Sequence, residues 1–344
     1  MRGAYLTSIS TQHFGRVSWM SNLVTIFGGS GFVGRYISSQ MAQQGWRVRV
    51  AVRRPNEALF VRTYGKVGQV EPILANIRDE ESTQIAIKGA EVVINCVGIL
   101  LEDRRQKFKT VQVQGAERIA RLSKNEGVKR LVHISAIGAD INSESISART
   151  KGEGEEAILK FFPNAVVLRP SIIFGIEDSF FNRFASMSRM SPFLPIVGAS
   201  TSFQPVYVDD IAKAASSAAM GRVPAGIYEL GGPDKETFKM LMERMLKVIR
   251  RRKIIINQPI IIANILAYSL DLLQSISMNM FKNSIITRDQ VRQLALDNVV
   301  TGNKGSFDDF GINPKSMDAI LESYLYQYRP YGQYTSIHES AGDN

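Results

Sequence analysis

Cysteine is almost absent from this chain, since one occurs in 344 residues, and an internal disulfide is therefore excluded. Cys96 stands within the apolar run VVINCVGIL, which favours a buried structural thiol over a reactive one. A reducing compartment fits this usage. We also find no secretory signal, internal repeat or low-complexity tract. The sequence thus excludes a disulfide-stapled scaffold and a repeat protein.

Acidic residues are fewer than basic ones. Forty-two Lys and Arg against 32 Asp and Glu give a formal charge of +10, which indicates acidic partners such as nucleotide phosphates, anionic lipid or an acidic protein surface. The sign of the charge alone does not choose among them. Residues 1–21 contain no acid and resemble a short targeting segment, while the alternative is an untidy start with Met20 as the true first residue.

Short β-branched runs alternate with helical stretches through the first half of the chain. The runs that we expect to form buried parallel strands are 22–29, 47–54, 70–77, 91–98, 129–138 and 165–175, with helices such as 33–45 and 109–126 between them. This alternation predicts an α/β fold, a doubly wound Rossmann-type parallel sheet with a smaller, mostly helical C-terminal lobe. The predicted divisions are a tail (1–21), a nucleotide-binding domain (22–235), the C-terminal lobe (236–323) and an extended tail (324–344).

The glycines after the first predicted strand have the spacing of a dinucleotide-binding loop, in FGGSGFVGRY. Gly28 permits a tight turn, Gly31 lets the backbone approach a pyrophosphate, and Gly34 allows the next helix to lie against the strand. The amides at the start of that helix, Phe32 and Val33, are predicted to face the phosphates. Its place between a strand and a helix favours a nucleotide site over a merely structural turn.

An acid is missing where an NAD-specific site carries one, at the end of the second strand. The sequence there is AVRRPNE, with Arg53 and Arg54 and no acid before Glu57. Guanidinium groups at this position suit a ribose 2′-phosphate, which predicts NADPH (NADP) rather than NAD(H) as the cofactor. The alternative is a solvated basic strand end.

Six segments occur in the order seen in extended short-chain dehydrogenases/reductases, which the chain resembles over residues 22–235. They are GGSGFVG, NCVG (95–98), ISAIGAD (134–140), RTKGEGE (149–155), LRPSIIFG (168–175) and QPVYVDDIAKA (204–214). Three further segments resemble the atypical subgroup that contains the nicotinamide-nucleotide-binding accessory subunit of respiratory complex I: RRP (53–55), FGIEDSFFNRFA and ITRDQVRQLALDNVV (285–299). The resemblance implies further cofactor-binding residues, namely Asn76, Ile77, Cys96, Val97, Gly98, Ser135, Lys151, Pro170 and Ile172.

The proton-transferring tyrosine of that superfamily is missing. Ser135 matches its serine and Lys151 its lysine, but Ser147 stands at the tyrosine position, four residues before the lysine. An aliphatic hydroxyl has a far higher pKa than a phenol, and loss of one general acid/base typically costs about 10²–10⁴ in rate. We therefore expect no catalytic residue, with Ser135 and Ser147 as vestigial positions. Tyr207 is the nearest substitute by motif.

The C-terminal lobe contains a basic run, VIRRRK (248–253), followed by an apolar stretch over 254–282. Pro259 and several polar residues argue against a spanning helix. Apolar positions 262, 266, 270, 273 and 276 trace one helical face, which predicts either a helix packed on its own domain or an interfacial helix on an anionic membrane surface or a partner.

Two functions of different class therefore compete. The first is a non-catalytic, NADPH-binding accessory subunit of complex I that supports assembly or stability at the membrane. The second is a soluble NADP-dependent reductase, epimerase or dehydratase with a displaced proton donor. Under the favoured first hypothesis the partners are complex I subunits and an anionic membrane surface, with no nucleic acid and no metal. The expected location is peripheral on the inner membrane, on the cytoplasmic side in a bacterium or the matrix side in a mitochondrion.

Overall fold

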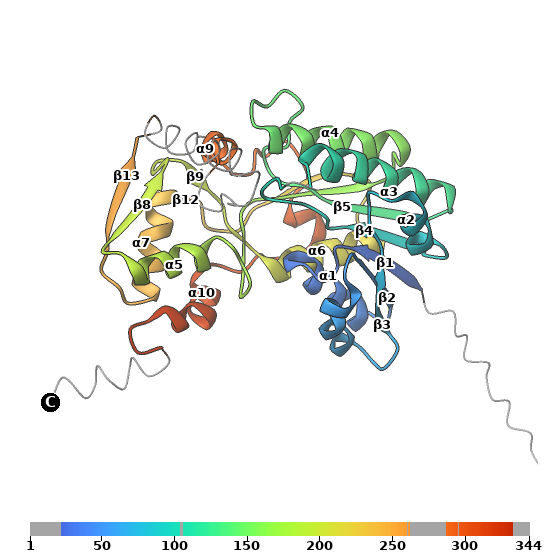
Figure 1. Ribbon diagram of the computed structural model, residues 1–344, viewed down its shortest axis with the longest axis horizontal. Helices are drawn as coiled ribbons and strands as arrows, with labels where there is room; N and C mark the ends of the chain where they lie inside the picture. Colours follow the sequence, from blue (N-terminus) through green and yellow to red (C-terminus); the bar gives the residue numbers. More distant parts are fainter. Residues whose placement is uncertain (1–21, 104–105, 260, 262–286, 295, 333–344) are drawn as a thin grey trace, which may run out of the picture.

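The computed structural model describes residues 22–103, 106–259, 261, 287–294 and 296–332, and its largest element is a seven-stranded sheet (Figure 1). Its strand order is β11-β6-β5-β4-β1-β2-β3, and every neighbouring pair is parallel. The strands are β1 (Leu23–Phe27), β2 (Arg47–Val52), β3 (Val70–Leu74), β4 (Val92–Asn95), β5 (Arg130–Ile134), β6 (Val166–Pro170) and β11 (Gly226–Leu230). The predicted α/β fold with a parallel Rossmann-type sheet is thus confirmed.

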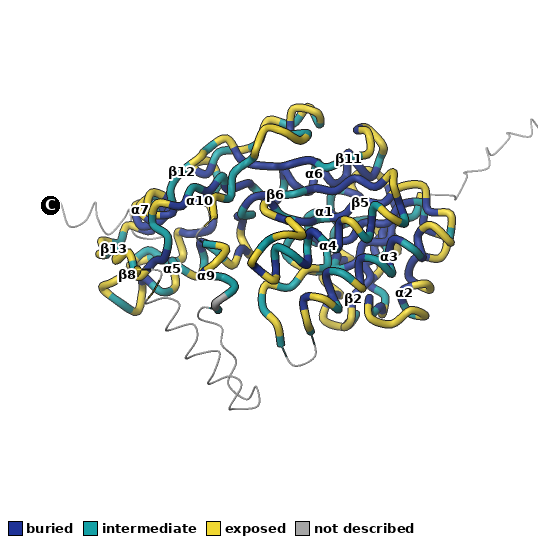
Figure 2. Tube along the Cα trace, turned by 90° about the horizontal axis from the view of Figure 1, so that it is seen from above, coloured by how far each residue is buried: buried dark blue, intermediate teal, exposed yellow. Residues whose placement is uncertain are grey.

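Helices cover both faces of this sheet. On one face lie α1 (Phe32–Gln43) and α6 (Val208–Ala219), and on the other lie α2 (Glu80–Ile87), α3 (Gln114–Asn125) and α4 (Ile146–Phe161). Most strand residues between these helices are buried, as Figure 2 shows, which explains their largely apolar sequence, while the edge strand β3 is partly exposed. Shorter helical turns, η1 (Pro55–Tyr64) and η2 (Lys109–Val113), precede β3 and α3.

Local signals fix where several helices begin. The side chain of Asp79 accepts a hydrogen bond from the Ser82 N–H and caps α2, and Ser145 caps α4 through the Ala148 N–H.

Strand β6 ends at Pro170, and after two residues β7 (Ile173–Phe174) begins and pairs with β10 (Val206–Tyr207). The single run predicted over 165–175 is therefore two strands, because the chain leaves the sheet at Ser171 to enter the smaller lobe.

The smaller lobe has its own core. It contains α5 (Phe181–Met190), α7 (Phe238–Val248) and α10 (Asp318–Leu325), and the strand pairs β8 (Phe193–Val197) with β13 (Ile254–Gln258) and β9 (Ser202–Phe203) with β12 (Glu236–Thr237). Phe174, Phe181 and Phe238 are fully buried there, each contributing roughly 1.5–3 kcal/mol. Residues on both sides of position 235 form this core. The predicted boundary between the nucleotide-binding domain and the C-terminal lobe at that position stays a prediction.

The C-terminal part of the chain returns to the sheet after α9 (Arg288–Leu294). Gly305 lies beside Tyr228 of β11, and the short helix η3 (Phe307–Phe310) places Phe307 in the core of the sheet domain. Helical structure then continues through η4 (Tyr326–Tyr328), past residue 324, where we expected an extended tail to begin. The reason is that Tyr324 is buried and its hydroxyl donates to Asp178 Oδ2 at 2.6 Å.

Three predicted segments lie wholly or partly outside the described residues: the N-terminal tail (1–21), the apolar stretch from 262 onward and the last part of the C-terminal tail (333–344). Within the described ranges, no helix is long and apolar enough to cross a membrane.

Candidate functional site

The glycine loop between β1 and α1 has the tight geometry that its sequence predicts. Gly28 has φ +73°, in the left-handed region that favours glycine, and its N–H donates to Ala51 O at 3.0 Å. A Cβ added to Gly34 would lie 2.2 Å from Gly28 O, so only glycine lets α1 begin this close to β1. The three glycines therefore bring the start of α1 onto the carboxyl edge of the sheet.

The N-terminus of α1 carries no side-chain cap and no acid in its first turn. Helix amides and the positive end of the helix dipole are thus available to an anion. The end of β2 lies beside this loop and carries Arg53 and Arg54, both exposed. Among the described residues Arg53 makes no hydrogen bond or ion pair, and Arg54 pairs with Glu57 at 3.0 Å in an exposed contact of little energy. Both guanidinium groups can turn to a phosphate.

The ends of β3 and β4 form the adjoining part of the same edge. Asn76 Oδ1 accepts from the Arg78 N–H at 3.2 Å, and Ile77 is buried. After β4, Cys96 lies against the turn at Gly28, where an added Cβ would be 3.3 Å from the Cys96 carbonyl carbon. Burial raises the pKa of the Cys96 thiol to about 12, which fits the predicted structural thiol. Val97 and the exposed Gly98 continue this loop.

Beyond β4, a buried histidine lies between the strand ends and α4. Asn95 Oδ1 accepts from the Val97 N–H at 3.1 Å, and Asn95 Nδ2 lies 3.2 Å from His133 Nδ1. Burial, followed by the charge of Lys151, lowers the pKa of His133 to about 4, so the imidazole is neutral at pH 7.

Ser147, Lys151 and Glu155 are spaced four residues apart on one face of α4, and Glu155 is bonded to Arg169 of β6 and to Ser135 after β5. Burial lowers the pKa of Lys151, while the nearby Glu155 carboxylate raises it in part. Ser135, after β5, donates its hydroxyl to Glu155 Oε1. The serine that the superfamily uses at its reacting centre is therefore bonded here to a carboxylate.

Glu155 belongs to a buried ionic network that sequence reasoning missed. Arg169 in β6 donates to Glu155 through Nε, at 3.0 and 3.1 Å, and through Nη2. Its Nη1 lies 3.9 Å from Glu229 in β11, the register neighbour of Arg169. Although burial lowers the pKa of Arg169, the bonds and charge of Glu155 outweigh it and raise the pKa overall. Charged residues inside two apolar strand runs, VVLRP and GIYEL, are the signal that could have indicated this pair.

The remaining predicted residues lie at the end of β6 or in the smaller lobe. Pro170 O accepts from the Ile137 N–H at 2.9 Å, and the Ile172 N–H donates to Asn298 Oδ1 at 3.2 Å. Tyr207 packs against Phe174 with ring centroids 5.7 Å apart and belongs to the core of the smaller lobe.

Because parallel strands end at a common edge, the structure brings most of the predicted residues together there. They lie at or after the ends of β1 (Gly28, Gly31, Phe32, Val33 and Gly34), β2 (Arg53 and Arg54), β3 (Asn76 and Ile77), β4 (Cys96, Val97 and Gly98), β5 (Ser135) and β6 (Pro170 and Ile172), with Lys151 on α4.

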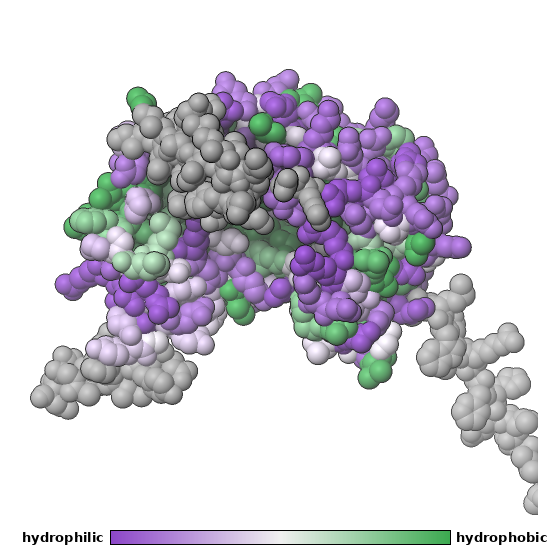
Figure 3. Space-filling model, viewed as in Figure 1, coloured by the Kyte–Doolittle hydropathy of each residue, from purple (hydrophilic) through white to green (hydrophobic). Residues whose placement is uncertain are grey.

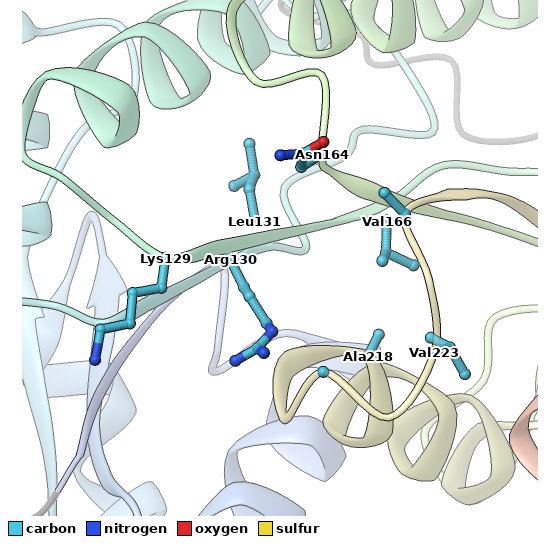
Figure 4. A pocket seen from close by; sticks show the side chains of 9 residues that line it. Lys129, Arg130, Leu131, Asn164, Val166, Ala218 and Val223 are labelled. Atoms are coloured by element: carbon cyan, nitrogen blue, oxygen red, sulfur yellow. The ribbon is translucent and has the colours of Figure 1, made fainter.

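A cavity of about 310 Å³ lies at the opposite edge of the sheet, between the starts of β5 and β6 and the end of α6 (Figure 4). It is not part of this site. Within the described ranges we find no cluster of side chains that could hold a metal ion.

Comparison with known proteins agrees with this geometry. A family model described as NAD(P)H-binding matches residues 28–159. A protein of Arabidopsis thaliana named NADH dehydrogenase (ubiquinone) 1 alpha subcomplex subunit 9, mitochondrial, is 34% identical over 324 residues, which are 92% of this chain and 81% of that protein. The chain belongs to the alpha subcomplex subunit 9 family of NADH dehydrogenase.

The subunit 9 protein of Mus musculus is 30% identical over 321 residues, 92% of this chain and 83% of its own length. Among solved structures, the NADPH-dependent quinone oxidoreductase QOR2 of Escherichia coli, in complex with NADPH, superposes with a TM-score of 0.67. It is 17% identical and covers 88% of this chain and 98% of its own, a likeness that shows the fold alone. The fold of this subunit 9 family member is thus shared with nucleotide-binding oxidoreductases.

Proposed function

We propose that the chain is a non-catalytic, NADPH-binding accessory subunit of respiratory complex I, NADH:ubiquinone oxidoreductase, which supports assembly or stability of the complex. One observation carries the proposal: a chain that matches subunit 9 proteins over 92% of its length keeps a glycine loop built for a dinucleotide but has Ser147 in place of the tyrosine. Complex I subunits are then its partners.

The choice of NADPH rests on the end of β2. Arg53 and Arg54 are exposed beside the glycine loop, and the one nearby acid, Glu57, holds Arg54 only through a solvated contact. A ribose 2′-phosphate would receive charge-assisted bonds from these groups, each worth about 1.5–3 kcal/mol. NADH lacks this phosphate, and Glu57, the acid that follows in the sequence, is already paired with Arg54 instead of standing free for the ribose hydroxyls.

The lack of turnover follows from what surrounds Lys151. A lysine in this superfamily position lowers the pKa of a phenol, and Ser147 offers none. Ser135 donates to Glu155 and is not free to polarise a substrate carbonyl. Bound NADPH then acts as structure, because a ligand that binds only the folded state adds RT ln(1 + [L]/Kd), about 2.7 kcal/mol at a hundredfold excess over Kd.

A peripheral position on the inner membrane is supported by one surface of the smaller lobe. Phe193, Ile254 and Ile256 are exposed on β8 and β13, and Figure 3 shows apolar side chains gathered there. The basic residues 251–253 precede β13 directly. Each cation near an anionic leaflet contributes about 1 kcal/mol, and apolar contact adds to this attraction. Such a surface suits the matrix or cytoplasmic face of that membrane.

The nucleotide chemistry can be tested with the purified chain. We expect it to retain NADPH and to leave the nucleotide absorbance unchanged when ketones, aldehydes, quinones or nucleotide sugars are added. The control is the same protein denatured to release its nucleotide, which an active dehydrogenase then oxidises. Turnover near 1 s⁻¹ by the unmutated chain would instead support the alternative, a soluble NADP-dependent reductase with a displaced proton donor.

A further inference from the structure

Two stretches of the returning chain, α9 (Arg288–Leu294) and residues 296–301, are bonded to the start of α4 and to the segments that follow β5 and β6; we call them the strap. We propose that the strap covers the start of α4 at Ser147, so that the chain's own residues keep small molecules away from the position where the superfamily has its tyrosine. The inference does not depend on complex I membership or on a bound nucleotide.

The first anchor of the strap is Asp289. Its Oδ1 accepts from the Ile146 N–H at 2.6 Å, and its Oδ2 accepts from the Ser147 N–H at 3.2 Å and from Ser145 Oγ at 3.0 Å. A carboxylate on the first turn of α4 satisfies amides that have no partner within the helix and complements the helix dipole. Gln293, one turn further along α9, donates to the same Ser145 hydroxyl at 3.0 Å. The strap is thus bonded to the very residue that replaces the tyrosine.

The second anchor is Asn298, at the end of β6. Its Oδ1 accepts from Ser171 Oγ at 2.7 Å and from the Ile172 N–H at 3.2 Å, and its Nδ2 donates to Ile137 O at 3.4 Å. Its backbone N–H donates to Ser202 O at 2.8 Å, at the start of β9. One residue therefore ties the ends of the strand segments β5 and β6 to the smaller lobe.

The third anchor is Thr301, which joins the strap to the buried ionic network. Both its N–H and its hydroxyl donate to Glu229 Oε2 at 2.7 Å. Glu229 continues through Arg169 and Glu155 to the hydroxyl of Ser135. The strap is therefore bonded to the start of α4, to the segment that follows β6 and, through Glu229, to β11.

Coverage of Ser147 by the strap predicts a result that simple packing of the strap against the fold does not. Ser147 is 7% exposed, although it lies in the first turn of a helix at the edge of the sheet. If the strap covers Ser147, loss of its anchors exposes this residue while the fold persists. If the strap only packs, loss of its anchors lowers stability and leaves Ser147 covered by its other neighbours.

Thiol labelling distinguishes these outcomes. In a Cys96→Ser background, we expect a cysteine from Ser147→Cys to react with a maleimide at least about 100-fold more slowly than one from Asn142→Cys, an exposed position nearby. Adding Asp289→Ala or Asn298→Ala should speed the reaction at position 147 at least about tenfold. Leu296→Ala is the matched control, because this exposed strap side chain lies between the two anchors and should leave the rate unchanged.

Amide hydrogen exchange provides a second measurement if an alanine variant does not fold. Asp289→Asn keeps the shape of the side chain but removes its charge, so exchange of the Ile146 and Ser147 amides should speed at least about tenfold while circular dichroism stays unchanged. Folded anchor variants whose position 147 remains as slow to label as in the parent would overturn the proposal. So would a parent whose position 147 labels as fast as position 142. Neither result would bear on nucleotide binding or on complex membership.

Discussion

At the scale of the residue, the proposed lack of turnover depends on Ser147. Its hydroxyl cannot replace a phenol as a proton donor, and its backbone N–H is bonded to Asp289. Lys151 and Ser135 remain near it, yet Ser135 is bonded to Glu155. Under the proposed function, the site keeps residues that fit a nucleotide but has no phenol at position 147 to use it.

Arg53 and Arg54 carry the predicted preference for NADPH over NADH. Replacing both by alanine should weaken NADPH binding at least about tenfold and leave NADH binding nearly unchanged, because only the 2′-phosphate loses charge-assisted bonds. Arg47→Ala is the matched control, since Arg47 is an exposed arginine at the other end of the same strand. Calorimetry measures both affinities. Equal affinity of the unmutated protein for the two nucleotides would contradict this assignment.

Some site residues could be predicted from sequence because their signal is local. Gly28, Gly31 and Gly34 stand within seven residues, and the two arginines follow directly after a strand. The partners of Ser147 and Ser135 could not be found in this way. Asp289 lies 142 residues after Ser147, and the Arg169–Glu155 pair joins a strand to a helix, so only the folded chain brings them together.

At the scale of the element, short β-branched runs predicted six strands of the sheet correctly, because most of the residues in these strands are buried and apolar. The seventh, β11, was not predicted. Its sequence, GIYEL, has a buried glutamate and begins at a glycine, both unusual in a buried strand. Glu229 is tolerated there because Arg169 and Thr301 satisfy it.

The contact of α1 with β1 depends on the missing side chain of Gly34. Gly34→Ala places a methyl group where Gly28 O already lies, which should lower the free energy of unfolding by at least about 2 kcal/mol. Gly98→Ala is the control, because a Cβ there meets nothing within 4 Å and the backbone is not in the left-handed region. Urea unfolding without nucleotide measures both. Equal stability of the two variants would show that α1 can move away from β1 without cost.

At the scale of the whole molecule, the chain passes between its two bodies several times. It enters the smaller lobe after β6, returns through α6 and β11, and comes back to the sheet at Gly305 and Phe307. Composition predicted a C-terminal lobe but not this path, because the segments that connect the two bodies share no sequence pattern. The strap is one result, since it bonds elements of both bodies.

The exposed apolar and basic residues of the smaller lobe predict how salt affects attachment of the protein to a membrane. Salt screens the attraction of residues 251–253 to anionic lipid but not apolar contact through Phe193 or Ile254. In washed native membranes, 0.5 M salt should therefore weaken attachment without full release, and serine at positions 251–253 should weaken it further at low salt. Serine at the exposed lysines 66, 88 and 109 is the control. Complete recovery of the unmutated protein in the soluble fraction at low salt would contradict a membrane contact.

The proposed role of the chain is that of an NADPH-carrying part of complex I. The direct measurement is to tag the chain in its own cell, solubilise the membranes in mild detergent and separate the complexes by native electrophoresis. We expect the tag to migrate with NADH dehydrogenase activity, and the excised band to contain about one NADPH per chain. Migration of the tag as a free protein of the chain's own mass, 38.3 kDa, with none in the active band, would contradict the account.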